Sequence, residues 1–302
     1  MIELWIPITI AAAFCQNLRS ALQKHLTSKL STSGATFIRF FYAVLPAWLY
    51  VWFLHDGVGL SMPEPQPAFW IYAAIGGATQ IAATALLVYL FAFRNFAVGT
   101  TYSKTETVQA AVFGIVILGD PLTAGAMVAI LISFIGVLAI SAAKQATGIS
   151  GIVRSLTSRT AMIGLASGAC FGISAVSYRA ASLSLGGEGF LIQAAFTLGC
   201  VTIMQTVAMA GYMRIRDPGQ ITAALRNWKV AGIVGLSGMA ASACWFTAMT
   251  IQNAAYVRAL GQIELVFTFA ASYLFFKEKS SPLELAGIGL VITGIFFLLL
   301  ST

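Results

Sequence analysis

The sequence predicts an all-α membrane protein with ten transmembrane helices, arranged as two inverted five-helix repeats. Three observations point to this fold: an apolar composition, ten apolar runs of spanning length, and a polar motif that occurs twice. The 302-residue chain is 59% hydrophobic and only 9% charged, with a mean hydropathy of +0.87. A soluble protein of this length needs many more charged side chains to cover its surface. The composition therefore indicates a polytopic membrane protein.

Ten apolar runs are long enough to cross about 30 Å of hydrocarbon, which takes about 20 helical residues. Strands would leave backbone groups unpaired in lipid, so we expect these runs to be helices. They cover 3–23, 34–54, 68–92, 96–118, 122–142, 160–182, 188–212, 229–250, 254–276 and 282–301. A polar linker at 147–159 separates a first repeat, 1–146, from a second, 160–302. Because five is an odd number, the second repeat enters the membrane from the opposite side, as in many secondary transporters.

The repeated motif places a carboxylate inside an apolar helix in each half. Glu106 and Glu264 lie 158 residues apart, and at the same offset Gly136 falls on Gly294. A carboxylate within a membrane span is costly and marks a functional site by default. Two such groups at matching places indicate a site between the halves.

Most basic residues occur at alternate connections between the apolar runs. Twelve of the 17 basic residues occur at the connections after helices one, three, five, seven and nine, and the even connections have none. The positive-inside rule then predicts that the odd connections are cytoplasmic and that both termini are outside, in an inner (plasma) membrane. The remaining five lie within or at the edges of the spans: Arg19, Arg39, Lys104, Arg179 and Arg258.

The closing helices of each half resemble those of the EamA-type members of the drug/metabolite transporter superfamily. The similar stretches are IELVFTFAASYLFFKEKSSPLELAGIGLVITGIFFLLL over 263–300 and ILGDPLTAGAMVAILISFIGVLAIS over 117–141, together with the Arg39-Phe40 pair. The resemblance covers nearly the whole chain. It implies a carrier fold but no particular substrate, since the family transports amino acids, other metabolites, amines and drugs.

Three features depart from the family pattern. Thr107 and Leu265 stand after the two acids where the family often has proline, so we expect only a mild kink in helices four and nine. Asp120-Pro121 replaces the usual Glu-Arg or Glu-Lys. Family members are usually described with both termini in the cytoplasm, whereas the charge distribution here predicts the reverse.

The first candidate site surrounds Glu106, about ten residues into helix four. Tyr102 at i−4 and Gln109 at i+3 share its helical face, and this combination suits a polar organic ligand. Glu106 either binds a substrate amine or a proton, or forms a structural ion pair with Lys104, Arg39 or Arg19.

The second candidate site surrounds Glu264, whose helical face is more apolar. Its carboxylate is a second candidate for proton coupling, because desolvation favours the protonated form. Lys104 either pairs with Glu264, attracts a substrate carboxylate or snorkels to the interface. Arg258 and Gln262 are i, i+4 neighbours, and Gln262 stands at the repeat position of Lys104. We include all of these residues among the substrate-binding candidates.

The end of helix one supplies two more candidates, Arg19 and Asn17, in a polar stretch that either lines the cavity or lies at the interface. Arg39 and Arg179 are better explained as interfacial anchors or contacts between helices. If several of the intramembrane cations face the cavity, the site would favour an anionic or zwitterionic solute.

The sequence thus predicts a secondary-active or facilitated transporter of a small polar or amphipathic metabolite, such as an amino acid or related compound, with export as the expected direction. The expected partners are the substrate, the bilayer and a proton as coupling ion; we expect no nucleic acid, cofactor or metal, and a monomer or homodimer. The alternative is an integral-membrane enzyme acting on a lipid, and a channel or receptor is a further alternative. No nucleotide-binding loop or hydrolase motif occurs, and His25 and His55 are the only histidines.

Overall fold

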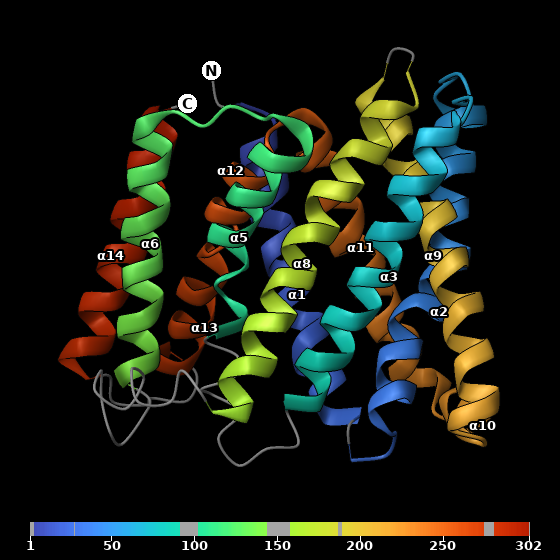
Figure 1. Ribbon diagram of the computed structural model, residues 1–302. Helices are drawn as coiled ribbons and strands as arrows, with labels where there is room; N and C mark the ends of the chain where they lie inside the picture. Colours follow the sequence, from blue (N-terminus) through green and yellow to red (C-terminus); the bar gives the residue numbers. More distant parts are fainter. Residues whose placement is uncertain are drawn as a thin grey trace.

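The computed structural model describes residues 3–26, 28–90, 102–143, 158–186, 189–274 and 281–301, and these residues form helices without any strand (Figure 1). The long helices are α1 (Trp5–Leu26), α2 (Thr32–Trp52), α3 (Pro67–Leu90), α6 (Ala124–Ala143), α8 (Arg159–Ser184), α9 (Phe190–Arg216), α11 (Trp228–Ile251) and α14 (Pro282–Ser301). The shorter helices are α5 (Glu106–Phe113), α10 (Gln220–Arg226), α12 (Ala254–Leu260) and α13 (Ile263–Leu274). π-helical turns extend α2 over Phe53–Gly57 and α5 over Gly114–Leu118.

Seven helical stretches within the described residues are long and apolar enough to cross a membrane, so the chain is a multi-pass membrane protein. The predicted number of ten is not confirmed. The span predicted at 96–118 is described only from residue 102, and the span predicted at 254–276 is interrupted. The prediction at 3–23 corresponds to α1, which is not among the seven and carries Gln16, Asn17 and Arg19 in its second half.

The mild kink predicted for helices four and nine is wrong for helix nine. Here α12 ends at Leu260, Gly261 and Gln262 form a turn, and α13 begins at Ile263. The break needs no proline, because the backbone bonds of Gln262 and Glu264 reach only three residues back and tighten the chain into a turn.

A similar interruption precedes α5 in the first half. Tyr102 and Ser103 are helical, Lys104 and Thr105 form a turn, and Glu106 begins the next helix. The Thr105 hydroxyl donates to the Tyr102 carbonyl at 2.6 Å and thereby occupies an acceptor that a continuous helix would use. Both repeats therefore break their helix within three residues before the acid.

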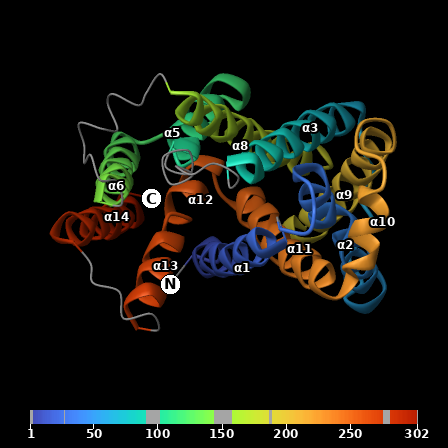
Figure 2. The same cartoon turned by 90° about the horizontal axis from the view of Figure 1, so that it is seen from below.

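The two halves are intertwined rather than side by side. α1 packs against α11 of the second half, and α8, its counterpart, packs against α3 of the first half. Two further pairs join equivalent helices, α2 with α9 and α6 with α14. Figure 2, seen along the helix axes, shows α6 and α14 together at one end and α2, α9 and α10 at the other. The core thus consists largely of contacts between the repeats.

Glycines on α6 and α14 show that this pairing is reciprocal. A Cβ on Gly136 would lie 2.6 Å from the Gly287 carbonyl oxygen and 2.8 Å from the Val291 nitrogen. A Cβ on Gly294, the repeat partner of Gly136, would lie 2.9 Å from the Ala129 carbonyl oxygen and 2.8 Å from the Ser133 nitrogen. The helices run in opposite directions (Figure 1) and meet backbone to backbone, which only small residues allow.

Both described ends of the chain lie at one face of the bundle, which we call the terminal face: α1 begins there and α14 ends there (Figure 1). The opposite face holds α10 and the start of α8. Two basic residues of the odd connections, Arg159 and Arg226, belong to these elements. That this face is the cytoplasmic one stays a prediction.

Candidate functional site

A cavity of about 370 Å³ lies between the repeats. Its wall combines α1 and α3 of the first repeat, the turn before α5, and α8, α12 and α13 of the second repeat. The lining residues are Gln16, Asn17, Arg19, Ser20, Ala21, Leu87, Ser103, Lys104, Glu106, Phe171, Arg258, Glu264, Leu265 and Thr268. The volume is typical of small-molecule sites and equals roughly a dozen water molecules.

Both intramembrane acids lie where a helix restarts. Glu106 is the first residue of α5 and Glu264 the second residue of α13. The first backbone N–H groups of a helix lack intrahelical partners and carry a partial positive charge, which favours an anion at this position. The two breaks therefore bring two carboxylates into the cavity wall and provide a favourable local field for each.

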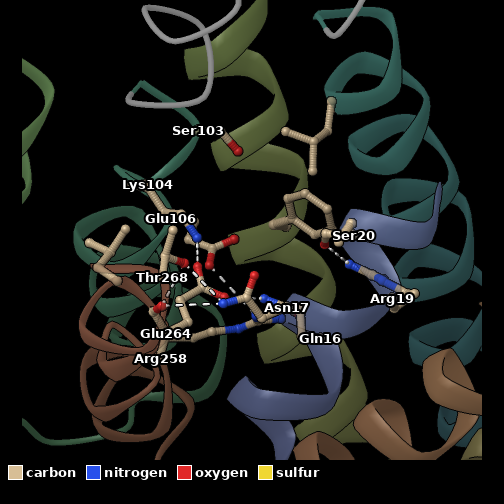
Figure 3. A pocket seen from close by; sticks show the side chains of 14 residues that line it. Gln16, Asn17, Arg19, Ser20, Ser103, Lys104, Glu106, Arg258, Glu264 and Thr268 are labelled. Carbon is tan, nitrogen blue, oxygen red and sulfur yellow. Dashed lines mark hydrogen bonds and ion pairs between the residues drawn. The ribbon is translucent and has the colours of Figure 1, made fainter. Parts of the chain in front are cut away.

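Each acid forms an ion pair with a cation of the other repeat. Lys104 pairs with Glu264, as one of the alternatives predicted, and Figure 3 shows this contact beside Glu106. The Arg258 Nη1 lies 3.6 Å from the Glu106 Oε1. The predicted partners of Glu106 were Lys104, Arg39 or Arg19, and that prediction is wrong, because the break after Leu260 lets α12 present Arg258 instead.

Amide groups of α1 complete the surroundings of Glu264. The Gln16 Nε2 donates to the Glu264 Oε2 at 3.0 Å, and the Asn17 Nδ2 donates to the Thr268 hydroxyl at 2.9 Å. The Trp245 indole donates to the Gln16 Oε1 at 3.0 Å, so α11 fixes the orientation of the Gln16 amide. This network ties the polar half of α1 to α13 across the repeats.

Trp245 also explains the glycine at the helix break. The ring contacts the position that a Cβ on Gly261 would occupy, so a side chain there would displace the indole. The Arg258 guanidinium lies 4.7 Å from the centre of the same ring, within range of a cation–π contact. The indole therefore supports the break, the arginine and the α1 amide together.

Six of the nine predicted binding residues line the cavity: Glu106, Glu264, Lys104, Arg258, Arg19 and Asn17. The polar end of α1 was predicted either to line the cavity or to lie at the interface, and it lines the cavity. Their role in substrate binding stays a prediction. The other three predicted residues, Tyr102, Gln109 and Gln262, do not line the cavity.

Tyr102 does not share one face with Glu106, because the turn at Lys104 and Thr105 cancels the i−4 relation. Gln109 follows Glu106 within α5, and its amide lies against α8. Tyr102 is buried in an apolar cluster with Ala142 and Ala161. The Gln109 Nε2 points to the Leu165 carbonyl at 3.5 Å, and its Oε1 would lie 2.9 Å from a Cβ on Gly168. Both side chains thus pack between helices.

Gln262 lies in the turn and joins the repeats instead of facing the cavity. Its Nε2 donates to the Thr107 hydroxyl at 2.6 Å. Thr107 stands where related sequences often have proline, whose side chain offers no such acceptor. The threonine that replaces the family's proline therefore forms a hydrogen bond with a residue of the other repeat.

Several residues of the cavity were not predicted from the sequence. Ser20, Ser103, Phe171 and Thr268 belong to the lining, and Trp245 supports it from behind. Thr268 is at i+4 from Glu264, so helical spacing could have found it. No local signal marks Phe171, since its position depends on how α8 packs against α5.

A second polar cluster lies near the terminal face, where α8 and α11 end. The Arg179 Nε donates to the Asp120 Oδ2 at 3.0 Å, and Arg179 Nη1 donates to the carbonyls of Met249 and Gln252 at 2.7 and 2.8 Å. Arg179 was predicted to be an anchor or a contact between helices, and the geometry matches the contact. The cluster joins the end of the π turn after α5 to α8 and α11.

Among the described residues, no group of three or more His, Cys, Asp or Glu side chains could hold a metal ion. The site is a polar cavity with paired charges between two repeats of a multi-pass membrane protein. Such a cavity between repeats is typical of carriers for small molecules.

The chain matches the EamA-like transporter family over residues 3–142 and 158–300 and belongs to this family. No curated protein is similar enough in sequence to be matched. A crystal structure of a 14% identical protein is similar with a TM-score of 0.70, covering 100% of this chain and 98% of the other. At this identity the similarity concerns the fold alone.

Proposed function

We propose that the protein is a secondary-active or facilitated transporter, in an inner (plasma) membrane, that moves a small polar or amphipathic metabolite of the size of an amino acid by alternating access. The observation that carries the proposal is the cavity between the repeats, in which each repeat supplies the counter-ion of the other's acid. Membership of a transporter family gives independent support.

The arrangement suits alternating access because the cavity and the closing contacts lie at different depths. The cavity is lined by the second half of α1 and the end of α3, toward the face that holds α10. The Arg179 cluster lies near the terminal face, about two helical turns beyond Phe171 along α8. We propose that this conformation is closed at the terminal face by Arg179 and opens there when the repeats rock.

The ion pairs also supply a route for coupling. A proton on Glu106 or Glu264 removes the attraction to Arg258 or Lys104, and the two contacts join opposite repeats. We propose that protonation of these acids loosens the repeats from one another and so links proton movement to the conformational change. Export is the proposed direction.

The test is solute flux in vesicles reconstituted with the purified protein. A carrier gives saturable flux, and Glu106→Gln should lower it strongly, because the paired charge at the repeat interface is lost. Asp56→Asn is the matched control, since Asp56 is an exposed acid in the turn after α2. Non-saturating flux would indicate a channel and contradict the proposal. Flux that ignores an imposed pH gradient would leave a facilitated carrier without proton coupling.

A further inference from the structure

Among the described residues, the lining of the cavity has one more cation than it has carboxylates. Arg19, Lys104 and Arg258 line it together with only Glu106 and Glu264. Lys104 and Arg258 have their ion pairs, but Arg19 forms none with an acid among the described residues. The described part of the lining therefore has one uncompensated positive charge.

Arg19 is buried without an acidic partner among the described residues; Arg39 shares this property, but only Arg19 lines the cavity. Its exposed fraction is 3%, and its stem packs over Gly238 of α11, where a Cβ would lie 3.3 Å from the arginine Cδ. Nη2 donates to the Ser20 hydroxyl at 3.3 Å, while Nε has no hydrogen-bond partner within the described part of the chain. A buried cation without a counter-ion is costly, so a site of this kind favours an incoming anion.

Arg258 is incompletely satisfied in the same cavity. Its Nε is likewise buried without a hydrogen-bond partner among the described residues. Its distance of 3.6 Å to Glu106 is that of an ion pair and too long for a good hydrogen bond. Arg19 is repelled by Arg258 and attracted by Glu106, and a bound anion would offset the repulsion between the two arginines.

The other lining residues indicate what kind of ligand fits the cavity. Leu87, Phe171 and Leu265 provide apolar surface, and the polar groups of Gln16 and Ser20 lie on the α1 side. Figure 3 shows Arg19 on one side of the view and the ion pairs of Lys104 and Arg258 on the other. This arrangement suits a solute with one anionic head and an apolar body.

We infer that the cavity takes a monocarboxylate with an apolar body, and that Arg19 is the residue that binds its carboxylate. The guanidinium fork matches the two carboxylate oxygens. A single negative charge neutralises the lining, whereas a phosphate monoester brings nearly two. A zwitterionic amino acid would need a free acid for its amine, and both acids already have cations. The inference rests on the proposed function and narrows its substrate class.

The experiment measures binding and does not depend on flux. Ligand-induced thermal shifts of the purified protein in detergent, followed by titration calorimetry, are compared across two matched series. The aliphatic series is 4-methylpentanoate, 4-methylpentanamide, leucine and 3-methylbutyl phosphate. The aromatic series is 3-phenylpropanoate, 3-phenylpropanamide and phenylalanine. A ligand that binds only the folded protein raises its melting temperature by mass action. We expect the largest shift from a carboxylate, and little from its amide or amino acid.

The variants are Arg19→Gln and Arg19→Lys, with Arg39→Gln as the matched control. Arg39 is also a buried membrane arginine, but it donates to Thr84 at 2.6 Å and is not part of the cavity lining. We expect Arg19→Gln to weaken carboxylate binding roughly tenfold or more, since hydrogen bonds to a charged group are lost. Arg19→Lys keeps the charge without the fork and should bind more weakly than the wild type. Arg39 lies beside Arg19 over Gly238, so Arg39→Gln removes a neighbouring charge but no ligand of the carboxylate, and it should weaken binding much less than Arg19→Gln.

Three outcomes overturn the inference: no shift with either carboxylate, equal shifts with the amides or amino acids, or equal losses in Arg19→Gln and Arg39→Gln. The flux experiment distinguishes a failure of this inference from a failure of the proposed function. Saturable flux of a solute without a carboxylate would contradict only the inference. Carboxylate binding that depends on Arg19 but gives no flux would contradict only the transport proposal.

Discussion

At the scale of single residues, the site is defined by two ion pairs, in each of which one repeat supplies the acid and the other repeat supplies the cation. Glu106 and Glu264 are mostly buried, and each faces a cation from the other half of the chain. Removing one partner of a buried ion pair leaves the other charge uncompensated, which costs more than losing the pair itself. The pairs therefore make the repeat interface sensitive to the protonation and occupancy of the cavity.

The Arg258 and Glu106 pair gives a prediction at this scale. Glu106→Gln and Arg258→Gln should each lower the melting temperature in detergent, and the double variant should lose less than the sum of the two. The side chains are only 10% and 7% exposed, so we expect a coupling on the order of 1–3 kcal/mol. Strictly additive losses would show that the two charges do not stabilise one another.

At the scale of elements, the helix breaks and the closely packed helix pairs depend on different interactions. The break before α13 depends on Gly261, which makes room for the Trp245 ring, and on backbone bonds that reach three residues back. The α6–α14 pair depends on glycines that let two backbones touch. Proline contributes to neither feature, although the family pattern suggested it for the break.

Gly136→Ala is a prediction at this scale. The added Cβ would lie 2.6 Å from a backbone oxygen of α14, so the two helices must move apart. We expect a loss of about 1–3 kcal/mol, the usual effect of overpacking, measured as a lower melting temperature in detergent. Gly289→Ala is the control, because nothing lies within 4 Å of a Cβ at that position on α14. Equal melting temperatures for the two variants would contradict the packing argument.

At the scale of the whole molecule, polar contacts lie at separate depths of one bundle. The Arg179 cluster holds α8, α11 and the end of the π turn together near the terminal face. The cavity lies deeper, between the repeats. Under alternating access, weakening the cluster should shift the population toward a state that is open at the terminal face.

Asp120→Asn tests this shift. A cysteine introduced at Ser20, in a background with the four native cysteines replaced by alanine, reports access to the cavity. We expect faster labelling from the terminal face by a membrane-impermeant thiol reagent, about tenfold for each 1.4 kcal/mol lost from the closed state. Asp56→Asn, also at an even connection, should leave labelling unchanged. An unchanged rate in Asp120→Asn would exclude the cluster as a closing contact.

The sequence by itself determined the class of protein, because helix formation in lipid depends on local composition and length. It also determined the repeat and singled out Glu106 and Glu264 as candidates, since a buried carboxylate is costly wherever its helix lies. Their role in binding stays a prediction. The offset of 158 residues matched Gly136 with Gly294 as equivalent positions of the repeats, but the contact between α6 and α14 came from the structure.

Only the tertiary structure decided which groups meet. It paired Glu106 with Arg258, turned Tyr102 and Gln109 away from the cavity, and left Arg19 without an acid among the described residues. Helical spacing could not find the position of Tyr102, because the turn before α5 resets the register of the helix. Gln109 follows Glu106 in α5, and its direction depends on how α8 packs against that helix. The ion-pair partners of Glu106, Glu264 and Asp120 come from the other repeat, and a contact between distant segments depends on packing rather than on local sequence.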